Sequence, residues 1–582
     1  MAVTVYYDGD CPFCTRYVRL LRLRRTAGKV HLVDLRDDAG SRRELEGDGF
    51  DPDQGMIVET EGRRLGGADA VNALALLSTP SGLFNRTNRL MLSSPALAAL
   101  IYPILRCGRW LALFLLGREG FAAEDSGLAA RGEIFGSFFA LFSIFHFFNY
   151  AFEYNRFPPQ WDMAALMLAA VVLLFRPSSA RVLCLLMLVS TVSTVLQAPV
   201  HSNHTMVRSA VLLGYWASFI LAMARGSRWS AVFANFTVAG QGALLVMYAF
   251  GVFHKINTDF LNPSTSCAVT LWRQMPEPLG WLDGPLVHHA TIYGTFIVEG
   301  VIVLMLLTPR LRHYGIVAGI LFHVLIALSG YAMYISFTML SISLHALFLS
   351  GEGAERIISS RGIRILRIRL INPLYAAIGL LLIAGLALAA ALEQYSLVTA
   401  LALPFVLPFC LLVVRHGRST QPLLRLGGGK RNRAAIVIGT VATVLFFANC
   451  AMPYLGLKSA QAVNMFANLR LEGGVSNHLV LSQPPGPFGY LHDIAVIKDS
   501  GGDAGLEWFR QGGYAIVYHD LLVRLQQRPD ILVSFTRGGR TYEKVGASDL
   551  ADDTAELLHP EWFRKWFHFQ PAALERPEPC NV

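Results

Sequence analysis

Between residues 134 and 448 the chain alternates long apolar runs with short polar loops. Most runs reach or approach the roughly 20 residues that a helix needs to cross a membrane. Eleven runs are predicted to span: 134–152, 161–175, 181–200, 206–224, 231–253, 288–308, 314–331, 333–349, 374–392, 397–414 and 434–448. This pattern predicts a polytopic α-helical membrane protein, with a count that depends on the short second and last runs.

The two flanking regions have the patterns of small mixed domains. Residues 1–120 place strand-like runs at 1–10 and 30–34 around a helix at 15–25, which is typical of an α/β fold. After residue 448 the chain alternates polar and apolar positions. The strands predicted there are 478–482, 493–498, 514–518, 531–535 and 541–545, and they precede an aromatic helix at 560–569. We therefore expect three domains: 1–120, a membrane bundle over 133–448, and a β-rich domain over 449–582.

Composition and charge agree with this division. The chain is 53% hydrophobic and only 16% charged, whereas about a quarter of the residues in a soluble protein are charged. The net charge is +9, and residues 132–433 hold 21 Lys and Arg against 10 Asp and Glu. A nucleic-acid binder would place this surplus on a polar basic face. Its position in the most apolar region argues against a soluble enzyme and against a nucleic-acid partner.

The basic residues also predict an orientation. Of the 21 in the bundle, 17 fall in loops on the side that faces the cytoplasm if residues 1–120 are cytoplasmic, as the inside-positive rule requires. The other side keeps only Arg156, Arg208, Lys255 and Arg273. Residues 1–10 lack the basic leader and apolar stretch of a signal peptide. We expect a cytoplasmic N-terminus and an extracytoplasmic C-terminal domain, in a bacterial inner membrane.

Cys11 and Cys14 form a C-x-x-C motif between a predicted strand and the start of a helix. A helix amino terminus stabilises a thiolate on Cys11, and Cys14 lies one turn further, where it can resolve a mixed disulfide. The alternatives are a structural zinc half-site, for which only His31 is nearby, or two unrelated core cysteines.

The residues around this motif resemble a known family. Tyr-Asp-Gly-x-Cys-x-x-Cys at 7–14, a second strand at 30–34 and Arg-Leu-Gly-Gly-Ala-Asp-Ala at 64–70 are similar to the DCC family of thioredoxin-like thiol-disulfide oxidoreductases. The resemblance extends to about residue 118, and it implies a redox-active dithiol that is served by a cytoplasmic thiol reductant. One departure is Gln-Gly-Met at 54–56, where thioredoxins carry a cis-proline.

Polar residues inside membrane segments are costly and mark candidate sites. His204, Gln241, His254, Lys255 and His323 lie in or at the ends of the predicted spans. Three interpretations remain open. In the first, the residues cap helices at the membrane interface. In the second, the histidines at 201, 204, 288 and 289 hold a metal ion. In the third, Lys255 acts as a base, because withdrawal from water disfavours its charged form.

A second resemblance favours the base. Ser-Asn-His at 202–204, Gly-Gln at 240–241, the segment 251–260 and Phe-His at 322–323 resemble the membrane domain shared by vitamin K-dependent gamma-glutamyl carboxylase and bacterial HTTM proteins, over roughly residues 133–350. The resemblance implies that Lys255 deprotonates a reduced naphthoquinone of the vitamin K or menaquinone type, which then reacts with dioxygen. His204 and His323 match histidines that hydrogen-bond the quinone. The supporting quinone-binding residues are Asn203, Gln241, His254 and Asp259.

The departures limit what this resemblance implies. The family enzyme has a second lysine where this chain has His254, and no surface for a glutamate-rich peptide is identified, so carboxylation is not supported. The leading hypothesis is a membrane oxidoreductase that oxygenates a quinone, with or without a coupled peptide or protein substrate at the exoplasmic side, and that carries a fused thiol-disulfide oxidoreductase domain. The alternatives are a membrane-anchored thiol-disulfide relay, or a non-enzymatic protein that handles lipids or peptides.

Three cysteines, Cys267, Cys450 and Cys580, fall on or near the oxidising side of the membrane under this orientation. A disulfide between two of them is expected there. The sequence leaves open which two are joined.

Overall fold

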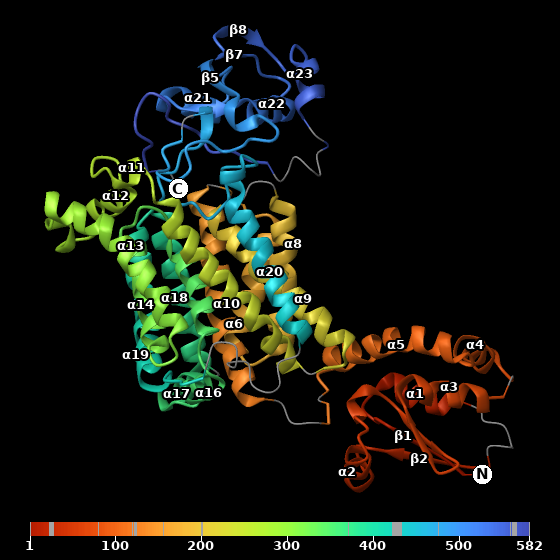
Figure 1. Ribbon diagram of the computed structural model, residues 1–582. Helices are drawn as coiled ribbons and strands as arrows, with labels where there is room; N and C mark the ends of the chain where they lie inside the picture. The colour runs from red at the N-terminus through yellow and green to blue at the C-terminus, as the bar shows by residue number, and fades with distance from the viewer. Residues whose placement is uncertain are drawn as a thin grey trace. The chain divides into compact units, whose positions relative to one another are not determined.

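The computed structural model describes residues 2–21, 28–79, 81–118, 120–121, 125–154, 156, 158–198, 202–227, 229–370, 372–421, 433–474, 476–558, 560 and 567–580. It divides into two compact units (Figure 1). The first comprises Met1–Ala129 and Tyr215–Asn235, and the second comprises Ala130–Gly214 and Phe236–Val582.

A four-stranded sheet forms the centre of the first unit. Its strands are β1 (Ala2–Tyr7), β2 (Lys29–Asp34), β3 (Ile57–Thr60) and β4 (Arg63–Gly66), in the order β2-β1-β3-β4. β1 and β2 are parallel, and β3 runs antiparallel to both β1 and β4. The parallel pair requires a crossover, and α1 (Pro12–Leu20) lies between the two strands. The predicted α/β fold of the N-terminal region is confirmed.

Helices complete this unit: α2 (Ala39–Gly47), α3 (Gly67–Leu77), α4 (Leu83–Leu92) and α5 (Pro95–Leu116). The core includes Val3, Val5 and Val58 from the sheet and Leu74 from α3, all fully buried or nearly so. The helix predicted at 15–25 begins three residues earlier than expected, and residues 22–27 lie outside the described part of the chain.

Every one of the eleven predicted apolar runs coincides with a helix. These are α6 (Ser126–Phe148), α7 (Trp161–Phe175), α8 (Ala180–Gln197), α9 (Asn203–Ala224), α10 (Trp229–His254), α13 (Pro285–Leu307), α14 (Arg312–Leu328), α15 (Ile335–Ala346), α18 (Pro373–Ala391), α19 (Tyr395–His416) and α20 (Arg433–Ala451). Short helices fill connections: α11 (Thr258–Leu261), α12 (Cys267–Arg273), α16 (Gly351–Ile358) and α17 (Arg361–Leu370).

Among the described residues, eight helices are long and apolar enough to cross a membrane. Seven of them coincide with predicted spans, and the eighth is α5 of the first unit. The runs that form α7, α14, α15 and α18 do not reach the same length and apolarity within the described residues. The chain is therefore a multi-pass membrane protein, and the number of eleven spans is not confirmed.

The C-terminal region contains a second sheet, formed by β5 (Ile494–Asp499), β6 (Ala515–Val517), β7 (Val533–Arg537) and β8 (Arg540–Val545) in the order β6-β5-β7-β8. All its pairs are antiparallel. In the described part of this region, three helices accompany the sheet: α21 (Ala504–Gly512), α22 (Tyr518–Gln527) and α23 (Ala551–Leu557). The region therefore has mixed α/β structure, and the predicted β-rich character is not confirmed.

The strand predicted at 478–482 is not formed. His478 makes only an isolated bridge with Asn257, and its Nε2 lies 3.0 Å from the Phe253 carbonyl oxygen. The Leu479 amide donates to the Ile256 carbonyl at 3.0 Å. The residues of this alternating segment therefore form hydrogen bonds with the end of α10 and do not pair with a neighbouring strand. Residues 561–566 of the predicted helix 560–569 lie outside the described residues.

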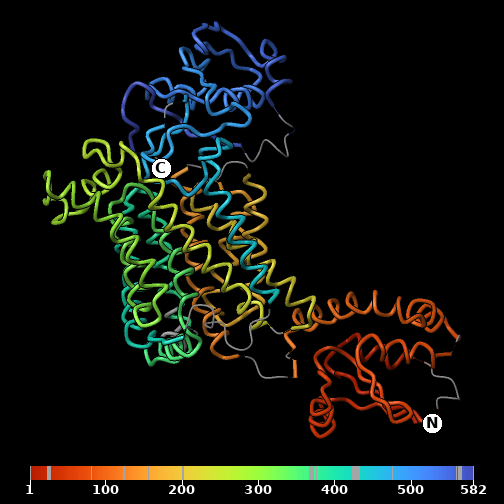
Figure 2. The backbone as a smooth tube through the Cα atoms, in the orientation of Figure 1, coloured from red at the N-terminus to blue at the C-terminus, as the bar shows by residue number. Residues whose placement is uncertain are grey.

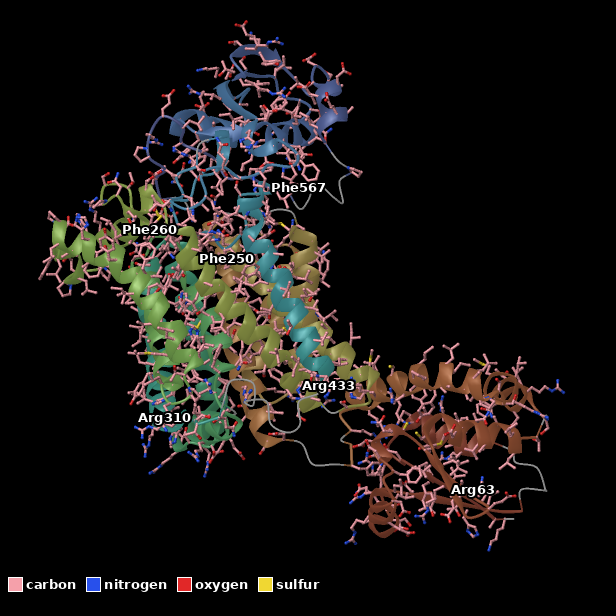
Figure 3. All side chains as sticks on the ribbon, viewed as in Figure 1. Arg63, Phe250, Phe260, Arg310, Arg433 and Phe567 are labelled. Carbon is pink, nitrogen blue, oxygen red and sulfur yellow. A yellow bond between two sulfur atoms is a disulfide. The ribbon has the colours of Figure 1, made fainter. Side chains whose placement is uncertain are left out.

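Within the second unit, the C-terminal sheet lies at one end of the helical bundle, away from Arg310 and Arg433 (Figure 1). Figure 3 places Phe567 at one end and both Arg310 and Arg433 at the other. The end of the chain returns to the bundle close to α11 and α12 (Figure 2). There Cys580 forms a disulfide with Cys267, and Cys450 carries a buried free thiol. The structure therefore chooses one of the three pairings that the sequence left open.

Candidate functional site

The dithiol lies at the start of α1. Cys11 is the N-cap residue, and its Sγ accepts a hydrogen bond from the Cys14 amide at 3.2 Å. Pro12 occupies the first turn, where its missing N–H costs nothing. The Thr15 hydroxyl donates to the Cys11 carbonyl at 2.9 Å and closes the turn. The strand-to-helix junction thus places the two thiols one turn apart, as the spacing predicted.

The two thiols have opposite acidities. Hydrogen bonding from Cys14, first through its side chain and then its backbone N–H, lowers the pKa of Cys11 to about 7, with the Arg109 guanidinium adding to the effect against burial. The pKa of Cys14 is raised far above the usual range for a thiol by its bond to Cys11 and by burial. Cys11 is therefore the more acidic of the two thiols.

Arg109 connects the dithiol to the rest of the unit. Its Nη2 donates to Asp8 Oδ2 at 2.7 Å, and its Nη1 donates to the Asp53 carbonyl at 2.6 Å. Asp8 is buried and also accepts from Arg36 Nε at 2.8 Å. Two guanidinium groups therefore neutralise one carboxylate directly before the dithiol motif, which leaves the local field favourable to a thiolate.

The segment 54–56, which departs from the thioredoxin pattern, lies under α5. Gly55 has φ of 142°, and a Cβ there would stand 2.0 Å from the Tyr102 hydroxyl oxygen. That hydroxyl donates to the Gln54 carbonyl at 2.6 Å. Cys11 has no exposed surface and Cys14 is 7% exposed. Tyr102 packs against the core cluster that contains both thiols, and in this arrangement Cys11 offers no surface to solvent.

An apolar cavity of about 580 Å³ lies in the second unit, between α10, α12, α13 and α14. Its walls include Phe260, Trp272 and Phe337, and the exposed side chains of Leu282 and Leu286 belong to its lining. The polar residues that line it are few: Tyr248, Lys255, Trp272, Thr291, Thr295, Glu299, His323 and Tyr334. A volume of this size with apolar walls and a few polar groups is typical of a small-molecule site.

Lys255 and Glu299 form a buried ion pair in the wall of this cavity. Lys255 Nζ donates to Glu299 Oε1 at 2.9 Å and to the Gly251 carbonyl at 2.9 Å. An ammonium has three donors, so one remains for a ligand. Glu299 Oε2 is buried and has no hydrogen-bond partner among the described residues. An amine and a carboxyl joined by one short hydrogen bond can exchange a proton directly.

His323 belongs to a directed chain of hydrogen bonds. His345 Nδ1 lies 2.7 Å from the Ser341 carbonyl, which can only accept. With neutral rings, His345 Nε2 then accepts from the Tyr248 hydroxyl, and Tyr248 accepts from His323 Nε2, both at 3.2 Å. His323 Nδ1 is left to accept from the Tyr334 hydroxyl at 3.1 Å. Both nitrogens of His323 therefore form hydrogen bonds with tyrosines. Tyr334 is the end of this chain of hydrogen bonds, and it lines the cavity.

His204 and Asn203 line a different, more polar cavity of about 430 Å³. The Ser202 hydroxyl lies 3.0 Å from His204 Nδ1, and Asn203 Oδ1 accepts from the Val463 amide at 2.9 Å. The two cavities share three lining residues: Tyr334, Phe337 and Met465. The structure thus brings Lys255 and His323 into one cavity and His204 and Asn203 into its neighbour.

The other three predicted quinone-binding residues line neither cavity. Gln241 Nε2 donates to the Leu347 carbonyl at 2.9 Å. His254 Nδ1 lies 2.6 Å from the Tyr454 hydroxyl oxygen and its Nε2 lies 3.1 Å from the Ala462 carbonyl oxygen. Asp259 Oδ2 accepts from Asn477 Nδ2 and from the Glu578 amide, both at 2.8 Å. These side chains tie α10 and α11 to neighbouring segments.

The described histidines do not gather as the metal hypothesis requires. Over the described ranges, no group of three or more His, Cys, Asp or Glu side chains is placed to hold a metal ion. His288 Nε2 is paired with Asp283, and His201 lies outside the described residues.

Sequence reasoning missed the groups that complete both sites. Glu299 is a carboxyl inside a predicted span, and this costly position was the available signal of a functional role. Its partner, Lys255, lies 44 residues earlier, so the sequence does not show the pairing. Tyr248 and Tyr334 carried no signal, because tyrosines are common near membrane interfaces. Arg109 lies 101 residues after Asp8. In each case the pairing comes from the packing of separate elements.

Comparison with known proteins identifies one part of the chain. No curated protein matches the sequence, and no solved structure matches it. Residues 5–112 match the family model of the DCC1-like thiol-disulfide oxidoreductases, so this segment, with Cys11 and Cys14, is a DCC1-like thiol-disulfide oxidoreductase domain.

Proposed function

We propose that this chain is a membrane-embedded oxidoreductase whose N-terminal domain exchanges disulfides through Cys11 and Cys14. The observation that carries the proposal is the asymmetry of the two thiols: the pKa of Cys11 falls to about 7, while that of Cys14 rises. A thiolate is the nucleophile in disulfide exchange, and a protonated neighbour is held back for the second step.

The reaction balances within the dithiol and its substrate. The Cys11 thiolate attacks one sulfur of a substrate disulfide, forms a mixed disulfide and releases the other sulfur as a thiolate. Cys14 then loses its proton to the solvent or the leaving thiolate and attacks Cys11 Sγ, which yields a Cys11–Cys14 disulfide and the second substrate thiolate. A thiol reductant, which we place in the cytoplasm, returns two electrons to the pair.

The acidity of Cys11 predicts a pH profile. Since an ordinary cysteine has the reference pKa of 9.0 and that of Cys11 is lowered to about 7, we expect thiolate absorbance in the ultraviolet to rise through a midpoint near pH 7. About half of Cys11 is then ionised at neutral pH. The difference between wild type and Cys11→Ser isolates this group without requiring a reagent to reach it. A midpoint near 9 contradicts the proposal.

A second candidate function concerns the membrane domain, and the pairing of Lys255 with Glu299 in an apolar cavity favours it. We propose that this cavity binds a reduced naphthoquinone. When bound, such a quinol supplies an ionisable ring hydroxyl and the electrons that dioxygen accepts. The apolar walls suit the ring system, and the third donor of Lys255 and the orphaned Glu299 Oε2 suit a hydroxyl.

The residues of the chain would then accept one proton from the ring hydroxyl of the ligand. When Glu299 carries the proton of the pair on Oε2, Lys255 Nζ is a neutral amine whose lone pair accepts the proton of the ligand hydroxyl. The ammonium that results is stabilised by Glu299 across the 2.9 Å hydrogen bond and by the Gly251 carbonyl. Tyr334, whose hydroxyl donates to His323, can accept a hydrogen bond from the ligand, because its oxygen retains free acceptor capacity.

The remaining residues take supporting parts in this proposal. His204 and Asn203 line the polar cavity beside Tyr334, where a coupled peptide or protein substrate from the exoplasmic side would meet the site. Gln241, His254 and Asp259 hold the surrounding segments by the hydrogen bonds described above. The resemblance of residues 133–350 to the carboxylase and HTTM membrane domain supports this assignment, and the family match ends before it, at residue 112.

A further inference from the structure

Helix α5 has one buried face and one exposed face. Its inner face buries Ala98, Arg109 and Leu113 against the first unit. Its outer face is apolar and exposed, and consists of Leu97, Leu100, Ile104 and Leu111. These positions are separated by three, four and seven residues, the spacing that keeps side chains on one side of a helix. Leu100 is 70% and Ile104 is 69% exposed, so the stripe is among the most exposed apolar surfaces of the unit.

The inner face carries two arginines that argue against a membrane-crossing α5, although the helix is long and apolar enough to span. Arg106 Nη1 donates to Gln54 Oε1 at 2.9 Å, and Arg109 Nη2 donates to Asp8 Oδ2 at 2.7 Å. Both arginines lie near the middle of the 22-residue helix, where a spanning helix would have to carry them through the hydrocarbon core. Their bonds instead fix α5 on the dithiol domain, and only one side remains for lipid.

Chain connectivity keeps this stripe near the bilayer. Residues 117–125 join the end of α5 to α6, which is long and apolar enough to span. A connection of this length reaches at most about 35 Å. The outer stripe, from Leu97 to Leu111, is about 21 Å long at 1.5 Å per residue. An apolar stripe held this close to a membrane fits the boundary between headgroups and acyl chains.

We infer that α5 is an interfacial helix that seats the thiol-disulfide oxidoreductase domain on the lipid surface. Its inner face packs on the domain, and its outer stripe enters the headgroup boundary. The same helix carries Tyr102, which packs against the core cluster around the dithiol, and Arg109, whose charge helps to lower the pKa of Cys11. The dithiol therefore operates at the membrane surface, where the disulfides presented to it belong to membrane proteins or to chains close to the bilayer.

Depth measurements along α5 test this inference in the full chain in lipid nanodiscs. A nitroxide side chain is introduced, one position at a time, at Leu97, Leu100, Ile104 and Leu111 through a noncanonical residue, so that the native cysteines stay in place. Collisions with dioxygen, which concentrates in lipid, are compared with collisions with a water-soluble nickel chelate. We expect all four positions to favour dioxygen and to lie at one shallow depth. Glu61, exposed in the turn between β3 and β4, gives the reference value for water.

Three results would each overturn the inference. A depth that is greatest at Ile104 and falls toward both ends would mean that α5 spans the membrane. Low access to both reagents at all four positions would mean that protein covers the stripe. Access to the nickel chelate equal to that at Glu61 would mean that the stripe lies in water. Because the substitutions are at exposed positions, the domain is expected to fold in every variant.

Discussion

Replacing Cys11 with serine is expected to abolish the reduction of disulfide substrates by the purified full-length protein. The serine hydroxyl is not ionised near neutral pH and cannot form a mixed disulfide, so the rate should fall by a factor on the order of 10³ or more, as for the loss of other covalent nucleophiles. The measurement is the initial rate of reduction of insulin or a small disulfide in detergent, with a thiol reductant in excess.

Two variants make this result specific to the dithiol. Cys14→Ser keeps the Cys11 nucleophile but removes the resolving thiol, so we expect a mixed disulfide to accumulate, visible as an adduct by mass spectrometry. Cys184→Ser alters a partly buried thiol of α8 that lies outside the dithiol, and it should leave the rate unchanged. Activity that survives in Cys11→Ser would show that another group performs the exchange.

Local patterns predicted the elements of the fold well, because each element is decided by a few neighbouring residues. All eleven apolar runs form helices, since an apolar stretch in lipid must satisfy its backbone hydrogen bonds internally. The number of membrane spans was harder to predict from sequence. The helix α15, for example, is apolar but has only 12 residues, and all of them are buried. Apolar composition alone does not separate a spanning helix from one that other helices surround.

Tertiary pairings account for what the sequence could not predict. His254 and Asp259 belong to the carboxylase-like segment 251–260. Their polar atoms nevertheless form hydrogen bonds with the segment after α20 and with the C-terminal tail. The alternation at 478–482 is typical of a strand, but it serves contacts with the end of α10. Glu299 was visible only as a costly carboxyl in a span. No local pattern records which distant element a side chain will meet.

Lys255 and Glu299 yield the second large prediction, that the quinol reaction depends on their pair. Purified protein in detergent is incubated with reduced menaquinone and dioxygen, and the quinone epoxide is measured by mass spectrometry. We expect Lys255→Met to lower the epoxide rate by roughly 10²- to 10⁴-fold, the usual contribution of a positioned base. Glu299→Gln keeps a hydrogen-bond acceptor but loses the proton carrier, so its rate should fall less.

Stability must be separated from chemistry in these variants. Removing one member of a buried ion pair leaves the other charge unpaired, at a cost of about 3–5 kcal/mol. The double variant Lys255→Met with Glu299→Gln removes both charges, so it should fold better than Lys255→Met and yet be no more active. Such non-additivity is expected of residues that act as one unit.

Lys458 provides the matched control, because it is a second buried lysine of the same unit. Burial lowers the pKa of Lys458 to about 8, so its acidity alone would make it a competent base. Its Nζ donates to Asn449 Oδ1 at 2.6 Å and to the Gln461 carbonyl at 3.2 Å, and it lines neither cavity. If position in the cavity decides the chemistry, Lys458→Met should retain the epoxide rate per folded protein. Equal epoxide from wild type and Lys255→Met, or none from wild type, would remove the quinone proposal and leave the dithiol as the site of chemistry.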